Sequence, residues 1–154
     1  QRFNNVPSPV VFMTVEGIIQ YTNQQVTMLF GWSEDEMKKK NIKMLMGEPF
    51  ASNHDLFLRK YQERSEMAEL KGQRLSSNIM GSGRDVMAKT KDNDPVRIFL
   101  MVERIDQASG RVADCLFMAK MVHVAEAAMS VSHAPQVLAG AVRWTGRTGL
   151  PGER

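Results

Sequence analysis

The chain has few of the residues that build covalent or metal-bound sites. Its single cysteine, Cys115, excludes an internal disulfide and any site that needs a pair of cysteines, and it agrees with a reducing compartment, so we expect a cytoplasmic location. Histidine chemistry has only three candidates: His54, His123 and His133. No apolar run approaches the roughly 20 residues that a membrane-spanning helix needs. The N-terminus also lacks the apolar segment of a signal peptide.

The charge balance is close to even. There are 20 Lys and Arg against 17 Asp and Glu, a net charge of +3 without a basic stripe, which argues against nucleic-acid partners. With 43% hydrophobic and 24% charged residues in 154, the composition fits one soluble globular domain with flanking sequence. A first residue other than methionine suggests a fragment of a longer protein. No G-x-S-x-G elbow, phosphate loop or carboxylate pair is visible, so we expect no enzyme activity in this piece.

The N-terminal half is predicted to begin with a hairpin and continue with short helices. An apolar, β-branched run predicts a buried strand at 10–15, and a returning strand is predicted at 18–22 after a tight turn at Glu16-Gly17. Further signals predict helical segments: Asn23 and Gly31 as caps, the capping box Ser33-x-x-Glu36, a short apolar element at 41–46, and a longer helix from about Asn53 to at least Gln62, capped by Ser52.

The C-terminal half is predicted to return to strands. A frayed helical extension and a loop are expected at 63–78, and strand patterns follow at 80–90, 96–105 and 112–122. Strands and helices in separate blocks indicate an antiparallel α+β domain. We expect this domain to span residues 1–124. The Ala- and Gly-rich residues 125–154 are predicted to be a flexible linker or added tail.

Several of these segments, in this order, resemble the PAS family over residues 3–122. They are the 10–22 hairpin, the Tyr21-Thr22-Asn23 step into a helix, the Phe30-Gly31-Trp32-Ser33-x-x-Glu36 turn and the Lys91-Asp92-Asn93-Asp94 turn. The resemblance implies a PAS fold: a five-stranded antiparallel sheet with short helices and one longer helix packed on one face. It also implies a regulatory sensor domain of a larger signalling protein, with any output enzyme domain outside this piece.

Two motifs resemble more narrowly the haem-binding oxygen-sensor PAS domains of the FixL type. They are His54-Asp55-Leu56-Phe57-Leu58 and Ile79-Met80-Gly81-Ser82-Gly83-Arg84. This resemblance implies a b-type haem whose iron is ligated by His54, with Arg84 contacting bound oxygen. It also implies that Leu100 and Val102 line the distal side of the haem.

The residues themselves are compatible with that chemistry. His54, Phe57, Leu58 and Tyr61 are spaced i, i+3, i+4 and i+7, which predicts one apolar helix face turned to the sheet. A neutral imidazole on that face could ligate haem iron. Other side chains have supporting roles: Ile79, Leu100 and Val102 as an apolar wall, and Met80 as an adaptable neighbour. The resemblance implies that Lys60 is a cation for the haem propionates.

These observations favour a module that senses O2, CO or NO and signals, as a homodimer, to an output domain. The alternative is a haem-free PAS domain that serves dimerisation or protein interaction, because a fold does not fix a function. A flavin photosensor is disfavoured because that related subfamily needs a cysteine at the start of the long helix. The only cysteine here is Cys115. No membrane or nucleic-acid partner is expected for this piece.

Overall fold

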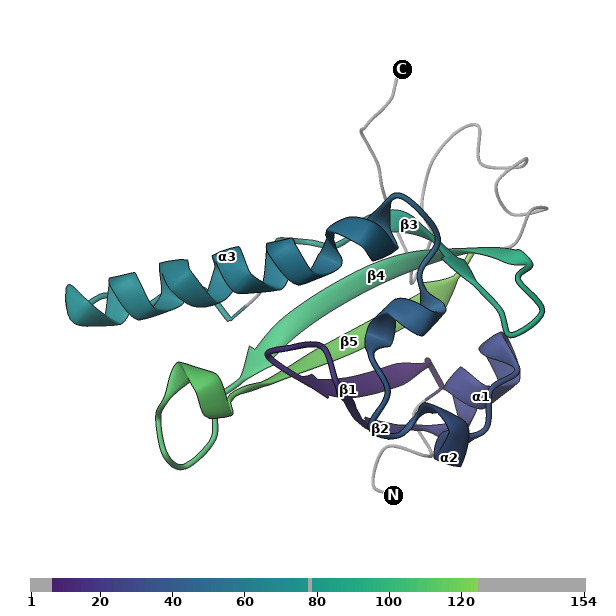
Figure 1. Cartoon of the computed structure of the whole chain (residues 1–154), viewed down its shortest axis with the longest axis horizontal. Helices are drawn as coiled ribbons and strands as arrows, with labels where there is room; N and C mark the ends of the chain where they lie inside the picture. Colours follow the sequence, from purple (N-terminus) through teal and green to yellow (C-terminus); the bar gives the residue numbers. More distant parts are fainter. Residues whose placement is uncertain (1–6, 78, 125–154) are drawn as a thin grey trace, which may run out of the picture. The chain divides into compact units, whose positions relative to one another are not determined.

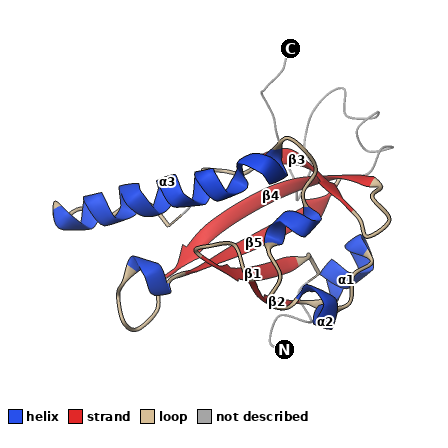
Figure 2. Cartoon of the chain, in the orientation of Figure 1, coloured by secondary structure: helices blue, strands red, loops and turns tan. Residues whose placement is uncertain are grey.

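The computed structural model of the chain describes residues 7–77 and 79–124. The described residues up to His123 belong to one compact unit. The predicted tail at 125–154 lies outside the described residues. The helices and strands, shown in Figures 1 and 2, run in the order β1 (Val10–Thr14), β2 (Ile19–Thr22), α1 (Gln24–Phe30), α2 (Glu34–Met37), the 3-10 helix η1 (Ile42–Leu45), α3 (Phe50–Leu70), β3 (Arg84–Lys89), β4 (Pro95–Ile105), the 3-10 helix η2 (Val112–Asp114) and β5 (Leu116–His123).

The five strands form one antiparallel sheet in the order β2-β1-β5-β4-β3. The C-terminal strand β5 is therefore central and pairs with both β1 and β4, which joins the two halves of the chain. The predicted α+β class and the five-stranded antiparallel sheet are confirmed. The three α-helices of the described residues and η1 lie in one connection between β2 and β3, as the separate blocks of strand and helix patterns indicated, and η2 lies between β4 and β5.

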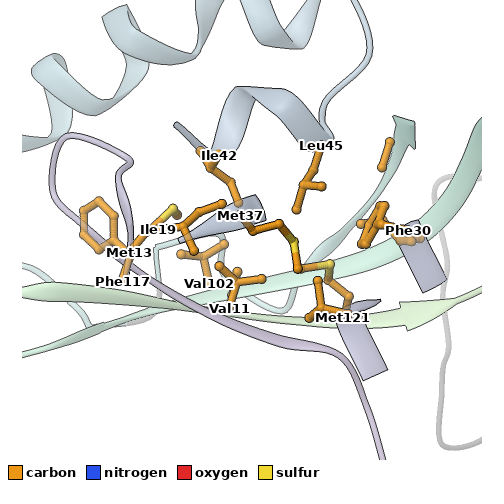
Figure 3. Packing of buried hydrophobic residues seen from close by; sticks show 14 of the residues in the cluster. Val11, Met13, Ile19, Phe30, Met37, Ile42, Leu45, Val102, Phe117 and Met121 are labelled. Carbon is orange, nitrogen blue, oxygen red and sulfur yellow. The ribbon is translucent and has the colours of Figure 1, made fainter. Parts of the chain in front are cut away.

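The core lies on the inner face of the sheet, beneath the helical segments. Successive side chains of a strand point to opposite faces, so Val11 and Met13 of β1 share this face with Phe117 and Met121 of β5. Figure 3 shows these side chains meeting residues from the helical connection. Phe30 of α1 is 1% exposed, and Met37, Ile42 and Leu45 are further buried residues of this connection.

The predicted capping box and the predicted end of α1 at Gly31 are confirmed. Asn23 holds the N-cap position of α1, but its side chain makes no capping hydrogen bond; its Oδ1 accepts one from the Val10 amide. The side chain of Ser33 accepts a hydrogen bond from the Glu36 amide, and the Glu36 carboxylate accepts one from the Ser33 amide, which completes the predicted capping box. Gly31 ends α1 with a φ of +87°, a left-handed conformation that glycine adopts without strain. The Lys91 ammonium lies 2.8 Å from the Glu36 carboxylate and 5.2 Å from the centre of the Trp32 ring.

The long helix α3 begins earlier than predicted, and it includes part of the helical extension expected at 63–78. It begins at Phe50, after Pro49, and not near Asn53. Ser52 lies inside it and donates a hydrogen bond to the Glu48 carboxylate at 2.6 Å, so the expected cap at Ser52 is wrong. The helix continues to Leu70 because residues 63–70 are mostly strong helix formers, and the chain then turns at Gly72, whose φ is +71°.

Two strands are shorter than predicted at their starts. The expected strand at 80–90 begins only at Arg84, because Gly81 and Gly83 adopt positive φ values of +64° and +106° in the preceding turns. The expected strand at 112–122 begins at Leu116, after the 3-10 helix η2. Cys115 therefore lies just before β5 and not within a strand.

Candidate functional site

The inner face of α3 carries five residues that turn toward the sheet. Leu58, Tyr61, Ser65 and Ala68 are buried, and His54 is partly buried one turn before Leu58. These positions follow the spacing i, i+4, i+7, i+11 and i+14 of one helix face. The predicted inward position of Phe57 is wrong. Its side chain is 45% exposed because it falls to one side of this stripe, although its ring centre remains 6.2 Å from that of His54.

The imidazole of His54 combines burial with an unpaired ring nitrogen. Nδ1 is buried and has no hydrogen-bond partner among residues 7–77 and 79–124. Burial lowers the pKa of His54 below its usual value; the Asp55 carboxylate opposes this shift, and Lys43 adds to it. The ring is therefore neutral at neutral pH, the state in which an imidazole nitrogen can ligate a metal. A buried polar atom without a partner costs free energy, which a ligand at this ring could recover.

The wall predicted opposite α3 is assembled from β4 and the turn before β3. Val102 is 8% exposed, and its carbonyl accepts a hydrogen bond from the Ile79 amide at 2.9 Å. Ile79, Met80 and Leu100 are half-buried and pack against the core. These three side chains are more exposed than Phe117 and Met121, which lie at the centre of the inner sheet face. The structure therefore brings the predicted wall residues together on one apolar surface.

Arg84 lies at the open edge of that surface. It is the first residue of β3 and pairs with Leu100 of β4, and directly paired residues of antiparallel strands project from the same face. Its side chain is exposed and makes no hydrogen bond or ion pair within the described part of the chain. Lys60 of α3 is likewise exposed. Both predicted cations are thus available to an anionic or polar ligand.

Sequence reasoning missed a polar cluster at the other end of β4. Arg104 is 6% exposed, and its guanidinium donates hydrogen bonds to the Tyr61 hydroxyl at 3.2 Å and to the Leu75 carbonyl at 3.3 Å. Its Nε lies 3.1 Å from the carboxylate of Asp106, which also pairs with Arg74. The cluster fixes Tyr61 of α3 to the sheet. The period-2 alternation through Ile98, Leu100 and Val102 was the signal that places Arg104 on the inner face.

Cys115 completes this cluster as an unreactive thiol. Its Sγ donates a hydrogen bond to the Asp106 carboxylate at 3.2 Å. Burial and this carboxylate raise the pKa of Cys115 to about 11. The thiol is therefore protonated at neutral pH, and a protonated thiol is a poor nucleophile.

A cavity of about 600 Å³ lies elsewhere, and its lining comes from α2, the turn before it and the segment around η1. The lining residues are Trp32, Asp35, Glu36, Lys40, Asn41 and Met44. None of the predicted site residues belongs to it. Within residues 7–77 and 79–124, no three His, Cys, Asp or Glu side chains gather as a metal site, and no helix has the length and apolar character to cross a membrane.

Comparison with known proteins identifies the family to which this fold belongs. The model of the PAS fold family matches residues 1–119. The chain therefore belongs to the PAS family, whose members are regulatory sensor modules, and the predicted family is confirmed.

Individual relatives agree with this assignment. The sensor protein FixL of Bradyrhizobium diazoefficiens is 30% identical over 99 residues, which cover 64% of this chain and 18% of that protein. This chain thus spans less than a fifth of the relative's length. The PAS domain of an HTR-like protein from Haloarcula marismortui superposes with a TM-score of 0.58 at 15% identity, over 79% of this chain and 85% of the other. The LOV protein of Rhodobacter sphaeroides gives 0.59 at 11%, over 83% and 65%. These two likenesses concern the fold alone.

Proposed function

We propose that this PAS domain is the haem-binding gas-sensor module of a larger signalling protein. His54 would hold the iron of a b-type haem through its imidazole, and Arg84 would supply a hydrogen-bond donor to a diatomic gas, O2, CO or NO. When present, the haem supplies an iron that binds such gases reversibly. The observation that carries the proposal is the imidazole of His54, which is neutral and has a buried nitrogen without a partner.

The surroundings of His54 have the chemistry that a large apolar ring with charged edges requires. The apolar contacts come from α3 and from the opposite wall: Leu58, Tyr61, Ile79, Met80, Leu100 and Val102. Phe57 lies at the rim, beside the imidazole. Lys60 and Arg84 are exposed cations, suited to the propionates and to the gas respectively. The likeness to a FixL sensor protein supports the same assignment.

The sheet offers a direct route from Arg84 to the end of the domain. Arg84 pairs with Leu100, and Leu100 pairs with Met121 of β5, two residues before that strand ends at His123. A hydrogen bond from the guanidinium of Arg84 to such a gas would restrain the side chain at the start of β3. We expect this change to shift the population between two packings of the sheet edge, which an output domain beyond this piece would read.

The first test of the proposal is retention of haem. The purified chain titrated with hemin is expected to give a Soret band that survives gel filtration, and His54→Ala is expected to abolish it, because the variant lacks the α3 imidazole that would hold the iron. Imidazole added to the buffer is expected to restore part of the band, which a purely structural defect would not allow.

His123→Ala is the matched control, because His123 is an exposed histidine at the end of β5. This variant is expected to keep the full Soret band. A wild-type protein that stays colourless with hemin would support the haem-free interaction module instead, and a yellow protein as purified would indicate a flavin. An unchanged Soret band in His54→Ala would show that His54 does not hold the iron.

The role of Arg84 is tested by the affinity for oxygen. Arg84→Ala in the haem-loaded protein is expected to weaken O2 binding by about 10- to 100-fold, the range for the loss of a hydrogen bond from a charged donor. Equilibrium titration followed by visible absorbance measures it. The matched control is Arg97→Ala on β4, since Arg97 is exposed and alternates with the inward-facing Val96 and Ile98. Equal O2 affinities in wild type and Arg84→Ala would exclude the proposed role.

A further inference from the structure

The outer face of α3 carries a regular row of exposed side chains, here called the outer seam. Its positions alternate in spacing between three and four residues: Asn53, Leu56, Lys60, Glu63, Met67 and Leu70. This is the a/d spacing with which two helices pack as a coiled coil. Leu56, Met67 and Leu70 are 43%, 54% and 83% exposed. Large apolar side chains in line on one helix face are typical of an interaction surface.

The rest of the domain leaves this surface accessible. The opposite face of α3 already packs inward through Leu58, Tyr61 and Ser65, so the outer seam points away from the core. Figure 1 shows the last turns of α3 running past the end of the sheet. A second helix could therefore lie along the outer seam without displacing any contact within the domain.

The outer seam is complementary to itself in the antiparallel direction. Its six positions are symmetric about the midpoint between Tyr61 and Gln62. A two-fold axis at that point sets Lys60 opposite Glu63 of a second copy, and each such pair occurs twice. The same axis sets Leu56 opposite Met67, which is an apolar pair. It also sets Asn53 opposite Leu70 at the two ends of the contact. Antiparallel coiled coils bring a and d positions together in this way.

The charged pair also selects against the other orientation. Two parallel copies in register would place Lys60 against Lys60 and Glu63 against Glu63, and like charges at facing positions are unfavourable. We propose that the outer seam of α3 binds the outer seam of a second copy of this chain, as an antiparallel helix pair. Lys60 is the one residue that the outer seam shares with the proposed haem site, and the dimer is tested without haem, so the two proposals can fail separately.

The first test is the oligomeric state of the full chain without haem. Sedimentation velocity over a wide range of concentrations is expected to show a monomer–dimer equilibrium. Met67→Glu is expected to raise the dissociation constant by more than about tenfold, because it places a charge against Leu56 of the second copy in both halves of the contact. Met67 is 54% exposed, so the variant is expected to keep its helical circular dichroism.

Met28→Glu is the matched control. Met28 lies on α1 and is 73% exposed, so the same substitution there is expected to leave the dimer unchanged. A wild-type chain that stays monomeric at every concentration overturns the proposal. So does a dimer that Met67→Glu leaves intact, because the contact would then lie on another face.

Charge reversal tests the central pair. Glu63→Lys alone is expected to weaken the dimer, because it faces Lys60 of the second copy with a like charge. The double variant Lys60→Glu/Glu63→Lys is expected to restore it, since it exchanges the two members of each pair. If the double variant dimerises as weakly as the sum of the two single effects, Lys60→Glu and Glu63→Lys, the pairing is contradicted. Haem content is scored separately, because Lys60 also belongs to the proposed haem site.

A spin label at position 53, introduced as Asn53→Cys, tests the direction. The seventeen residues that separate Asn53 from Leu70 correspond to about 25 Å along a helix, at about 1.5 Å per residue. Two labels in an antiparallel pair are therefore expected at least that far apart, whereas a parallel pair would hold them at about the 8–10 Å between helix axes. The native Cys115 is buried and its pKa is about 11, so labelling is selective. The short distance would overturn the antiparallel arrangement.

Discussion

Replacement of Phe117 by alanine is expected to lower the free energy of unfolding by about 3–5 kcal/mol. Phe117 is 1% exposed in the central strand β5, and its ring meets that of Tyr61 edge to face, with the centres 5.5 Å apart. The substitution removes apolar contacts from β1, β4 and α3 at once and leaves a cavity that the sheet cannot close. Urea denaturation, with the midpoint and the slope fitted separately, measures the loss.

Phe50→Ala is the matched control for the same change of side chain. Phe50 is the first residue of α3 and is 43% exposed. Folding buries less apolar surface at this position than at Phe117. We therefore expect Phe50→Ala to lower the free energy of unfolding by less than about 1 kcal/mol. Similar losses for the two variants would mean that Phe117 does not occupy the centre of the core.

Gly83→Ala is expected to cost about 2–4 kcal/mol for two separate reasons. The φ of Gly83 is +106°, a conformation that costs an alanine about 1–3 kcal/mol. A Cβ at this position would also lie 2.8 Å from Cγ of Met101 and 2.8 Å from the Phe99 ring, which forces these two half-buried side chains to shift. Thermal and urea unfolding of the haem-free protein measure the combined effect.

Gly81→Ala separates the two causes. Gly81 also has a positive φ, +64°, but a Cβ there would meet no atom within 4 Å. We expect only the backbone cost of about 1–2 kcal/mol. A loss as large as that of Gly83→Ala would show that the contacts with Met101 and Phe99 contribute nothing. The difference between the two variants therefore measures the steric part, in the turn that leads into Arg84.

The parts of the fold that the sequence predicted correctly depend on neighbouring residues. The capping box of Ser33 and Glu36 and the end of α1 at Gly31 are local hydrogen-bond and backbone preferences, so they survive in any tertiary context. The strand pattern through Val96, Ile98 and Val102 is similarly local, because alternation reports which side of a strand is buried. The five-stranded sheet follows from such patterns once their order is known.

The incorrect or missed predictions concern residues whose positions depend on distant contacts or on competing local signals. Ser52 has the chemistry of an N-cap, yet α3 begins at Phe50 and leaves Ser52 in its first turn. Phe57 is apolar and close to the inner face of α3, but its angle around the helix leaves it exposed. Residue spacing alone does not predict how wide a strip of the helix the sheet buries. Arg104 was missed because a charged residue near the end of a strand normally reaches water. Its partners, Tyr61 and Asp106, become neighbours only in the folded chain.

The contacts of Lys91 have a consequence for how the domain opens. Its amide donates to the Phe30 carbonyl at 2.8 Å, its ammonium pairs with the Glu36 carboxylate that also caps α2, and the same group lies over the Trp32 ring. The turn between β3 and β4 is thereby tied to the start of α2, far away in the sequence. Neither segment can unfold locally without losing these bonds, so their amide hydrogens should exchange with solvent through one shared opening.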